Sequence, residues 1–242
     1  MVNESYYAGV YWGPRKESSE ECARRLEVLL EGLSSVDPSL GHWFQQGKSR
    51  ADALKRPLSP NLAELEAFVR KGKDRTFDEL GFSIGGWNGA GDDYETTGFL
   101  IACGGYSEWT GNRCVYTLPS KGPSLERTLS APALAALMRQ TADAWEPDWG
   151  VAISEQHRDS LKPRRPKGTP YVGWVTYLAH HWGTFPPLPA PVRVEPVGDK
   201  GTLIVLTPER FTVSNPEHVA LAERVRELLD RAGLLKPLQA QP

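Results

Sequence analysis

The sequence lacks any long apolar run. No stretch of its 242 residues approaches 18 consecutive apolar side chains, so no segment is predicted to span a membrane. The stretch Met1–Trp12 also lacks a basic segment followed by an apolar core, and no secretion signal is expected. We therefore expect a cytoplasmic protein that does not bind membranes.

Cysteine is scarce. The three residues Cys22, Cys103 and Cys114 are an odd and sparse set. They fit reduced thiols in a cytosol better than a disulfide framework. Cys103 and Cys114 fall on consecutive predicted strands, but two thiols do not make a zinc site. The sequence therefore predicts that they are buried small hydrophobic side chains.

A strong net charge is also missing. The formal charge is −2, from 28 basic and 30 acidic residues, which gives no overall attraction to nucleic acid or anionic lipid. One basic loop, Leu161–Pro170, carries Lys162, Arg164, Arg165 and Lys167. No aromatic residue is interleaved there to stack on bases, so we expect no direct nucleic-acid binding. A nucleic-acid-binding or scaffolding module built on this loop stays as an alternative.

No catalytic or metal-binding constellation can be recognised. The adjacent His180 and His181 end a predicted strand, where their rings point to opposite faces and cannot easily share one metal ion. No cysteine or histidine pair has zinc-site spacing. We therefore predict no catalytic residues, no metal and no cofactor. The alternative is a small cytosolic enzyme, which would need His180, His181, Asp148 and Cys103 to converge in a cleft.

The glycine-rich stretch Gly81–Gly91 does not predict a phosphate site. A phosphate cradle opens directly into the N-terminus of a helix. Here a strand is followed by the acidic run Asp92–Glu95, whose carboxylates would repel phosphate. The acidic run itself is interpreted as a solvated loop or as a loop that contacts a partner.

Four helices are predicted from apolar stripes at helical spacing. The first covers Ser19–Leu33, with Ser18 and Glu21 as a capping box. The second follows Ser59, with Pro60 in its first position, and ends near Gly72. The third follows Ser130, and the fourth follows Asn215 and ends at Gly233.

Eight strands are predicted between the helices. The runs 99–103 and 203–206 are apolar on both faces, which predicts central strands. Gly104–Gly111 is expected to be a hairpin connection. The predicted strands are Tyr6–Trp12, Gly81–Gly86, Thr97–Cys103, Arg113–Leu118, Trp149–Ser154, Tyr171–Leu178, Val192–Glu195 and Thr202–Leu206.

Strands occur in runs and do not alternate strictly with helices. This order favours an α+β fold, with a largely antiparallel sheet or sheets of about eight strands and about four packed helices. We expect residues 1–238 to form a single domain and Gln239–Pro242 to be a frayed tail.

Eight tryptophans give the sequence an unusual aromatic content. Trp145 closes a helical stripe and Trp174 lies in an apolar strand, so both are predicted in the core. Aromatic residues in turns, beside acidic residues, form a plausible contact surface for another protein. The candidate partner-binding residues are Trp87, Asn88, Asp92, Asp93, Tyr94, Glu95, Trp109 and Trp182.

Several short motifs, in this order and spacing, are similar to those of a known family. They are YYAGVYWGPRKESSEEC, GF followed by WNG, CG after the central strand, WEPDWG, GWVTYL, TPERF and NPEHVALAERVRELLDRAGLL. Together they span about residues 6–235. The chain resembles the immunity protein 52 family of bacterial polymorphic-toxin systems.

The resemblance implies a cytoplasmic antidote to a toxin delivered by contact-dependent or type VI secretion. Such a protein binds and blocks its cognate toxin, and the toxins implied include restriction-endonuclease-like nucleases. Acidic residues could then face the basic rim of a nuclease active site. The net charge of −2 departs from a nucleic-acid mimic, so inhibition by distortion stays an alternative. The oligomeric state is not predicted.

Overall fold

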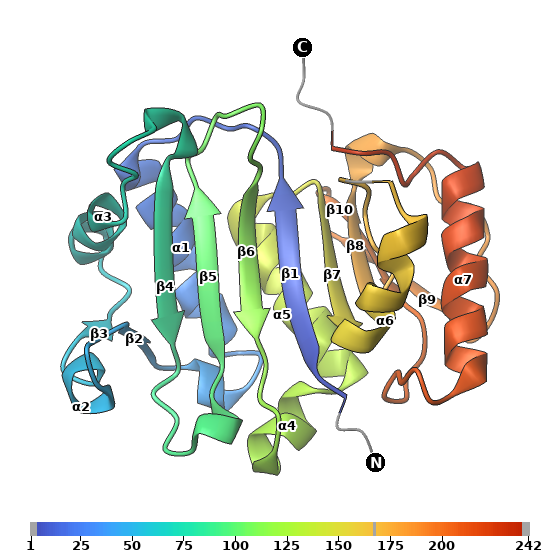
Figure 1. The fold of residues 1–242 in the computed structure, drawn as a ribbon, viewed down its shortest axis with the longest axis horizontal. Coiled ribbons are helices and arrows are strands. Elements are labelled where there is room, and N and C mark those ends of the chain that lie inside the picture. The colour runs from blue at the N-terminus through green and yellow to red at the C-terminus, as the bar shows by residue number, and fades with distance from the viewer. Residues whose placement is uncertain (1–3, 167, 239–242) are drawn as a thin grey trace.

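Within residues 4–166 and 168–238, the part that the computed structural model describes, ten strands form one sheet (Figure 1). The strand order is β3-β2-β4-β5-β6-β1-β7-β8-β10-β9, and neighbouring strands run antiparallel. The strands are Tyr6–Trp12 (β1), Trp43–Gln45 (β2), Pro57–Leu58 (β3), Phe82–Trp87 (β4), Gly98–Cys103 (β5), Asn112–Thr117 (β6), Trp149–Ser154 (β7), Val175–Ala179 (β8), Arg193–Val197 (β9) and Gly201–Val205 (β10).

The strand β1 lies in the interior of this sheet. Its residue Val10 is opposite Cys114 of β6 on one side and Gly150 of β7 on the other. The predicted bounds of β1 and β7 agree with the structure. The expected hairpin connection Gly104–Gly111 joins the antiparallel pair β5 and β6.

Seven α-helices are present in the described part of the chain, and none of them is long and apolar enough to cross a membrane. Figure 1 shows α1 and α5 behind the sheet, and α6 and α7 in front of its β7–β8–β10–β9 end. The helices are Ser19–Leu33 (α1), Arg50–Ala53 (α2), Leu62–Lys71 (α3), Gly122–Thr128 (α4), Ala131–Trp145 (α5), Glu155–Leu161 (α6) and Pro216–Arg231 (α7).

Local capping explains where the long helices begin. The capping box of Ser18 and Glu21 at α1 is present as predicted. The predicted start of α3 was wrong. It is capped by Asn61, whose side chain accepts the N–H of Glu64, and not by Ser59. Asn61 stands directly before the first apolar residue of the stripe, so its oxygen reaches the unpaired helical N–H groups.

The core lies between the sheet and the helices on either side. Trp145 and Trp174 are fully buried, as the sequence predicts. The thiols of Cys22, Cys103 and Cys114 are unpaired and buried, which confirms their interpretation as small hydrophobic side chains.

The two predicted central strands differ in what covers them. Residues Gly201–Val205 of β10 are buried throughout, because the sheet has helices on both sides at this end. In β5, every second residue is only partly buried or exposed, and the side chain of Leu100 is 45% exposed. Within the described residues, no helix lies in front of β4, β5, β6 and β1 (Figure 1). The strand β5 is central, as predicted, since it pairs with β4 and β6, but only one of its faces is covered by helices.

The fold class is α+β with an antiparallel sheet, as predicted, but the numbers of elements were too low. The additional strands and helices, β2, β3, α2, α4 and α6, have only two to seven residues, too few to show a period. The strand β8 also begins later than predicted. At Gly173 the backbone passes so close to β7 that a Cβ would lie 2.6 Å from the oxygen of Ala152. The expected frayed tail, Gln239–Pro242, and Lys167 of the basic loop lie outside the described residues.

A candidate binding face on the uncovered side of the sheet

The uncovered face of β4, β5, β6 and β1 is a candidate binding surface, and we call it the open face. Alternation along each strand sends every second side chain to this side. The pairing register aligns these positions in three rows across the four strands. The rows are Trp87, Gly98, Thr117 and Tyr7; then Gly85, Leu100, Val115 and Gly9; then Ser83, Ala102, Arg113 and Tyr11.

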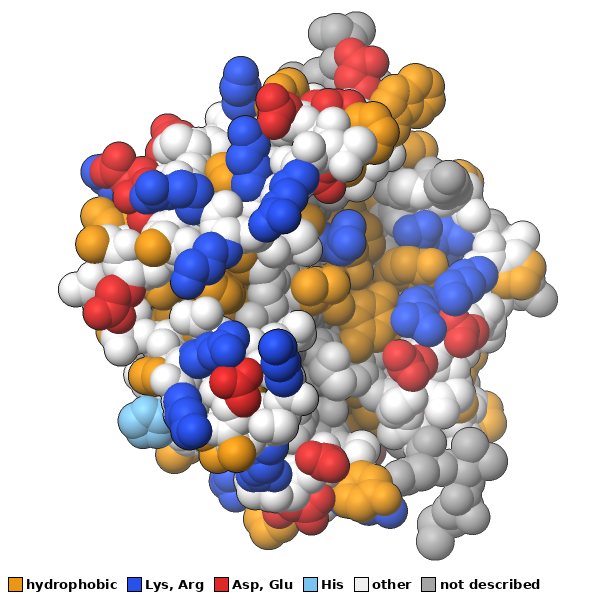
Figure 2. Space-filling view, turned by 60° about the vertical axis from the view of Figure 1, so that its left-hand side comes forward, with side chains coloured by type: hydrophobic (Ala, Val, Ile, Leu, Met, Phe, Trp, Pro, Cys, Tyr) orange, Lys and Arg blue, Asp and Glu red, His pale blue; other side chains and the backbone are white. Residues whose placement is uncertain are grey.

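Apolar side chains occupy the middle of the open face. Leu100 is 45% exposed, and its neighbour Val115 is half-buried. Figure 2 shows a hollow on this side of the molecule, with hydrophobic side chains on its floor and Lys and Arg side chains on both sides. An apolar hollow with a charged rim is typical of a site that another molecule covers.

A groove of about 730 Å³ runs along β1 and β6, on the side of the open face nearest α6. Tyr7, Tyr11, Val115 and Tyr171 are among its lining residues. The ring of Tyr11 stacks on Trp149 with centroids 4.3 Å apart. The glycine at position 9 leaves room for this ring, because a Cβ there would lie 3.0 Å from the Tyr11 hydroxyl and 3.2 Å from Val115 Cγ2.

Four aromatic side chains of the open face and its rims each carry a cation over the ring. Such contacts fix the aromatic ring and the charged group in one geometry. The distances from cation to ring centroid are 5.2 Å for Arg158 over Tyr7, 3.6 Å for Arg165 over Tyr171, 4.3 Å for Lys121 over Tyr94 and 5.6 Å for Arg50 over Trp87.

The polar groups of the groove are partly withdrawn from water. Burial raises the pKa of Tyr7 and of Tyr11, whose hydroxyls hydrogen bond to each other, so both hydroxyls stay protonated above their ordinary titration range. Burial also lowers the pKa of Arg165. Within the described residues, the buried Nε of Arg165 has no hydrogen-bond partner.

Three of the candidate residues predicted from sequence border the open face. Trp87 stands in one of its rows, while Asp93 and Tyr94 line the groove. Tyr94 is 53% exposed and lies in a short 3₁₀ turn, Asp93–Glu95, which Asp92 caps.

The other candidates in this segment have intramolecular roles. The buried Asn88 accepts the N–H of Thr97 at 3.0 Å. The carboxylate of Asp92 accepts the N–H of Tyr94 at 2.9 Å, and Glu95 accepts the N–H of Ser124 at 3.2 Å. These hydrogen bonds hold the β4–β5 connection in place, so that Tyr94 remains at the edge of the groove.

Trp109 and Trp182 lie elsewhere. The connection 88–97 precedes β5 and the connection 104–111 follows it, so they stand at opposite ends of a six-residue strand, about 17 Å apart. The expected cluster of Trp109 with the acidic run Asp92–Glu95 therefore does not form. Trp109 is 93% exposed.

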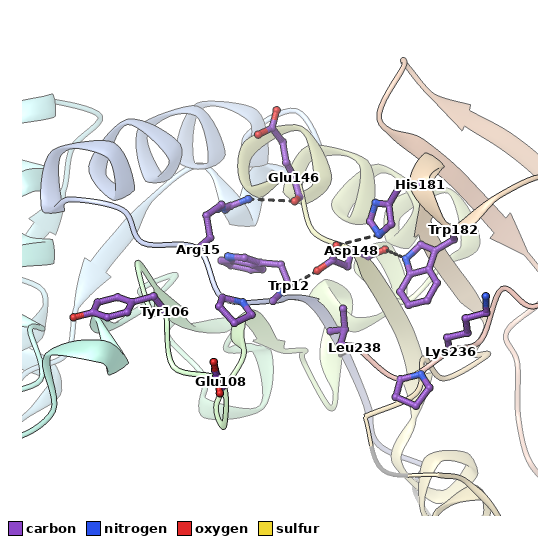
Figure 3. A pocket seen from close by; sticks show the side chains of 13 residues that line it. Trp12, Arg15, Tyr106, Glu108, Glu146, Asp148, His181, Trp182, Lys236 and Leu238 are labelled. Carbon is purple, nitrogen blue, oxygen red and sulfur yellow. Dashed lines mark hydrogen bonds and ion pairs between the residues drawn. The ribbon is translucent and has the colours of Figure 1, made fainter. Parts of the chain in front are cut away.

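A cleft of about 720 Å³ lies at the Trp109 end of the sheet (Figure 3). It is lined by Trp182, by Lys236 and by Tyr106 and Glu108 of the Trp109 connection. The indole N–H of Trp182 donates to the backbone oxygen of Asp148 at 2.7 Å. The structure thus brings Trp182 close to the connection that carries Trp109.

This cleft contains two of the residues that the enzyme alternative requires, His181 and Asp148. His181 Nε2 lies 3.2 Å from Asp148 Oδ1, and the other carboxylate oxygen accepts the N–H of Gly13 at 2.8 Å. A histidine and an orienting carboxylate are two parts of a catalytic triad. Among the described residues that line this cleft, however, there is no Ser, Thr or Cys.

The convergence that the enzyme alternative required does not occur. Cys103 is fully buried, and a hydrogen bond with Cys22, together with burial, raises the pKa of its thiol. His180 is exposed and is not among the residues that line the cleft. Residues 4–166 and 168–238 contain no group of three or more His, Cys, Asp or Glu placed to hold a metal ion.

Sequence reasoning missed Leu100 and Arg113 on the open face and Tyr171 in the lining of the groove. One signal was available: in β1, Tyr7 and Tyr11 lie at the alternate positions that face away from the core. The sequence could not show that no helix packs on this side.

An antiparallel sheet with helices behind it and an apolar, tyrosine-rich open face defines an α+β protein with a surface suited to a macromolecular partner. The sequence model of the family described as Immunity protein 52 matches residues 4–238. The chain therefore belongs to the immunity protein 52 family. No curated protein matches the chain significantly.

The fold is similar to a solved structure titled "Pseudomonas aeruginosa T6SS protein PA0821". The TM-score is 0.53 with 15% sequence identity, over 93% of this chain and 72% of that one. At this identity the similarity shows the fold alone.

Proposed function

We propose that this chain is a cytoplasmic immunity protein that binds and neutralises a cognate secreted toxin, with the open face as its contact surface. Membership of the immunity protein 52 family supports the class of partner. The choice of surface rests on the exposure of Leu100, an apolar side chain that is 45% exposed although it lies on an interior strand. Covering this side chain would remove apolar area from water on binding.

The size of the open face indicates which neighbouring segments take part. Its four strands span about 14 Å across and about 17 Å along, an area of about 240 Å². A stable interface takes about 800 Å² from each partner. The contact must therefore extend over the rims, which carry Trp87, Tyr94 and Arg158.

In this proposal the toxin is delivered by a type VI secretion system or a similar contact-dependent route, and a nuclease is the toxin class that we favour. The immunity protein acts by occupying a surface of the folded toxin, either blocking its active site or distorting it. Trp109 and Trp182, at the other end of the sheet, are proposed as a second contact region.

Co-expression tests the proposal. The chain is produced together with the toxin domain encoded by the neighbouring gene, and growth and co-purification are measured. We expect growth to be restored and a stable complex to form. Continued killing without a complex would refute the function. A complex unaffected by substitutions at Leu100 and Tyr94 would refute the surface but not the function.

A further inference from the structure

Three exposed aromatic side chains lie together at one end of the sheet. In the described part of the chain four aromatic residues are exposed, and three of them are Phe77 (54%), Tyr106 (38%) and Trp109 (93%). Phe77 precedes β4, while Tyr106 and Trp109 lie between β5 and β6, at the end of these strands that is uppermost in Figure 1. We call these three residues the aromatic end.

Hydrogen bonds join the two connections that carry the aromatic end. The backbone oxygen of Glu79 accepts the N–H of Tyr106 at 2.8 Å and the N–H of Ser107 at 3.1 Å. Phe77 is two residues before Glu79 in the sequence, and Trp109 is two residues after Ser107. The three aromatic residues therefore stand on adjoining turns.

The backbone of the β5–β6 connection is also fixed from below. The side-chain amide of the buried Asn112 donates to the backbone oxygens of Gly13 at 2.8 Å and Gly105 at 2.9 Å. Its oxygen accepts the N–H of Gly105 at 2.9 Å, and Trp109 donates its own backbone N–H to Ser107 Oγ at 3.3 Å. Because this backbone is already held, a partner loses little free energy in ordering it.

Charge does not select the partner of the aromatic end. The three connections at this end, residues 13–18, 72–81 and 104–111, carry four cationic and five acidic side chains, a net charge of only −1. Lys73 and Asp78 already pair with each other at 3.0 Å. What distinguishes this end is exposed apolar area.

The size of that area indicates how a partner sits. At about 150–250 Å² for each fully exposed side chain, the aromatic end presents about 400 Å². A stable interface takes about 800 Å² from each partner, so a second copy of the chain bound through this end alone would bury only half of that area. The open face adjoins it, since Ala102 and Arg113 are the last pair of β5 and β6 before the 104–111 connection. A partner that covers both surfaces approaches the required area.

We propose that the toxin extends from the open face, past Ala102 and Arg113, onto the aromatic end, where an apolar pocket of the toxin receives the indole of Trp109. The rim of that pocket packs on Phe77 and Tyr106. The inference rests on the proposed function and adds the chemistry of the partner at the second contact region. A buried indole N–H takes a hydrogen-bond partner, so the pocket also presents one acceptor.

Isothermal titration calorimetry with the toxin domain of the neighbouring gene tests the inference. We expect Trp109→Ala to weaken Kd about 30-fold or more and Phe77→Ala about fivefold, as for aromatic residues at the centre of an interface. The matched control is Val28→Ala on α1, behind the sheet, where the side chain is 49% exposed; its Kd should change less than about twofold.

Two further measurements check that the contact is apolar. Trp109→Phe keeps an aromatic ring and should weaken Kd less than about fivefold. The loss in Trp109→Ala should be the same, within about twofold, at about 50 mM and 300 mM salt, because apolar burial is not screened by ions. A loss that disappears at the higher salt would overturn the apolar pocket. Thermal unfolding checks each variant, and since Trp109 is 93% exposed its removal should leave Tm unchanged.

The outcomes separate the inference from the proposed function. A wild-type complex whose Kd is unchanged in Trp109→Ala would overturn the inference and leave the function standing. Absence of any complex with the wild type would refute both. Sedimentation velocity of the chain without toxin should show a monomer. A dimer that Trp109→Ala converts to a monomer would assign the aromatic end to a second copy and overturn the inference.

Discussion

Leu100→Ala is the substitution that tests the open face most directly. The residue is 45% exposed in the free protein. A leucine presents about 180 Å² when fully exposed, so about 80 Å² is left for a partner, worth about 2 kcal/mol at 25 cal/mol per Å². Alanine keeps only the β-carbon. We expect a loss of about 1.5 kcal/mol in binding, which is roughly tenfold in Kd.

Isothermal titration calorimetry with the toxin domain measures this loss. The matched control is Val194→Ala on the edge strand β9, where the apolar side chain is 46% exposed and lies outside the open face. Thermal unfolding of both variants separates binding from stability, because Leu100 also packs on neighbouring strands. An unchanged Kd for Leu100→Ala in a folded protein would refute the assignment of this surface.

Three further outcomes are expected. His181→Ala should leave protection against the toxin intact, since the cleft pair with Asp148 is not part of the open face; loss of protection in the growth assay, with the toxin complex still formed, would favour the enzyme alternative. Tyr116→Phe removes a buried hydrogen bond of 2.9 Å to Thr141 and should cost about 1 kcal/mol, seen as a Tm lower by about 2–4 °C. His157 is buried and its pKa is lowered by burial, so its contribution to stability is complete above about pH 6.5 and falls as the pH drops below that value. Urea unfolding gives the free energy of unfolding at about pH 5 and pH 7.5. The difference between the two pH values should be smaller for His157→Leu than for the wild type, and equal differences would contradict this.

The long elements of the fold were predictable from sequence, because their periodicity and caps are local. The helix α1 shows this, with Ser18 and Glu21 marking its start and six buried apolar residues forming its stripe. The strands β2 and β3 could not be predicted, because two or three residues show no alternation. Their pairing next to β4 depends on the tertiary arrangement.

The binding face was only partly predictable for a different reason. Trp87 and Tyr94 could be chosen because glycine and acidic residues mark their turns. Leu100 could not, because its segment is apolar at every position and gives no sign of which face is left uncovered. Exposure there depends on helices that pack elsewhere, and hence on the position of α6 and α7 at the far end of the sheet.

The interior position of β1 determines when the protein can act during its own synthesis. Val10 finds its strand partners, Cys114 and Gly150, only on the order of a hundred residues later in the chain. Until β7 has left the ribosome, β1 can pair only with β6. The tyrosines of β1 that line the groove therefore lie in an incomplete sheet. Under the proposed function, a nascent chain with this topology cannot bind the toxin through the groove. The proposed function then requires completed protein to be present before the toxin enters the cell, because newly started synthesis would supply the binding surface only after a delay.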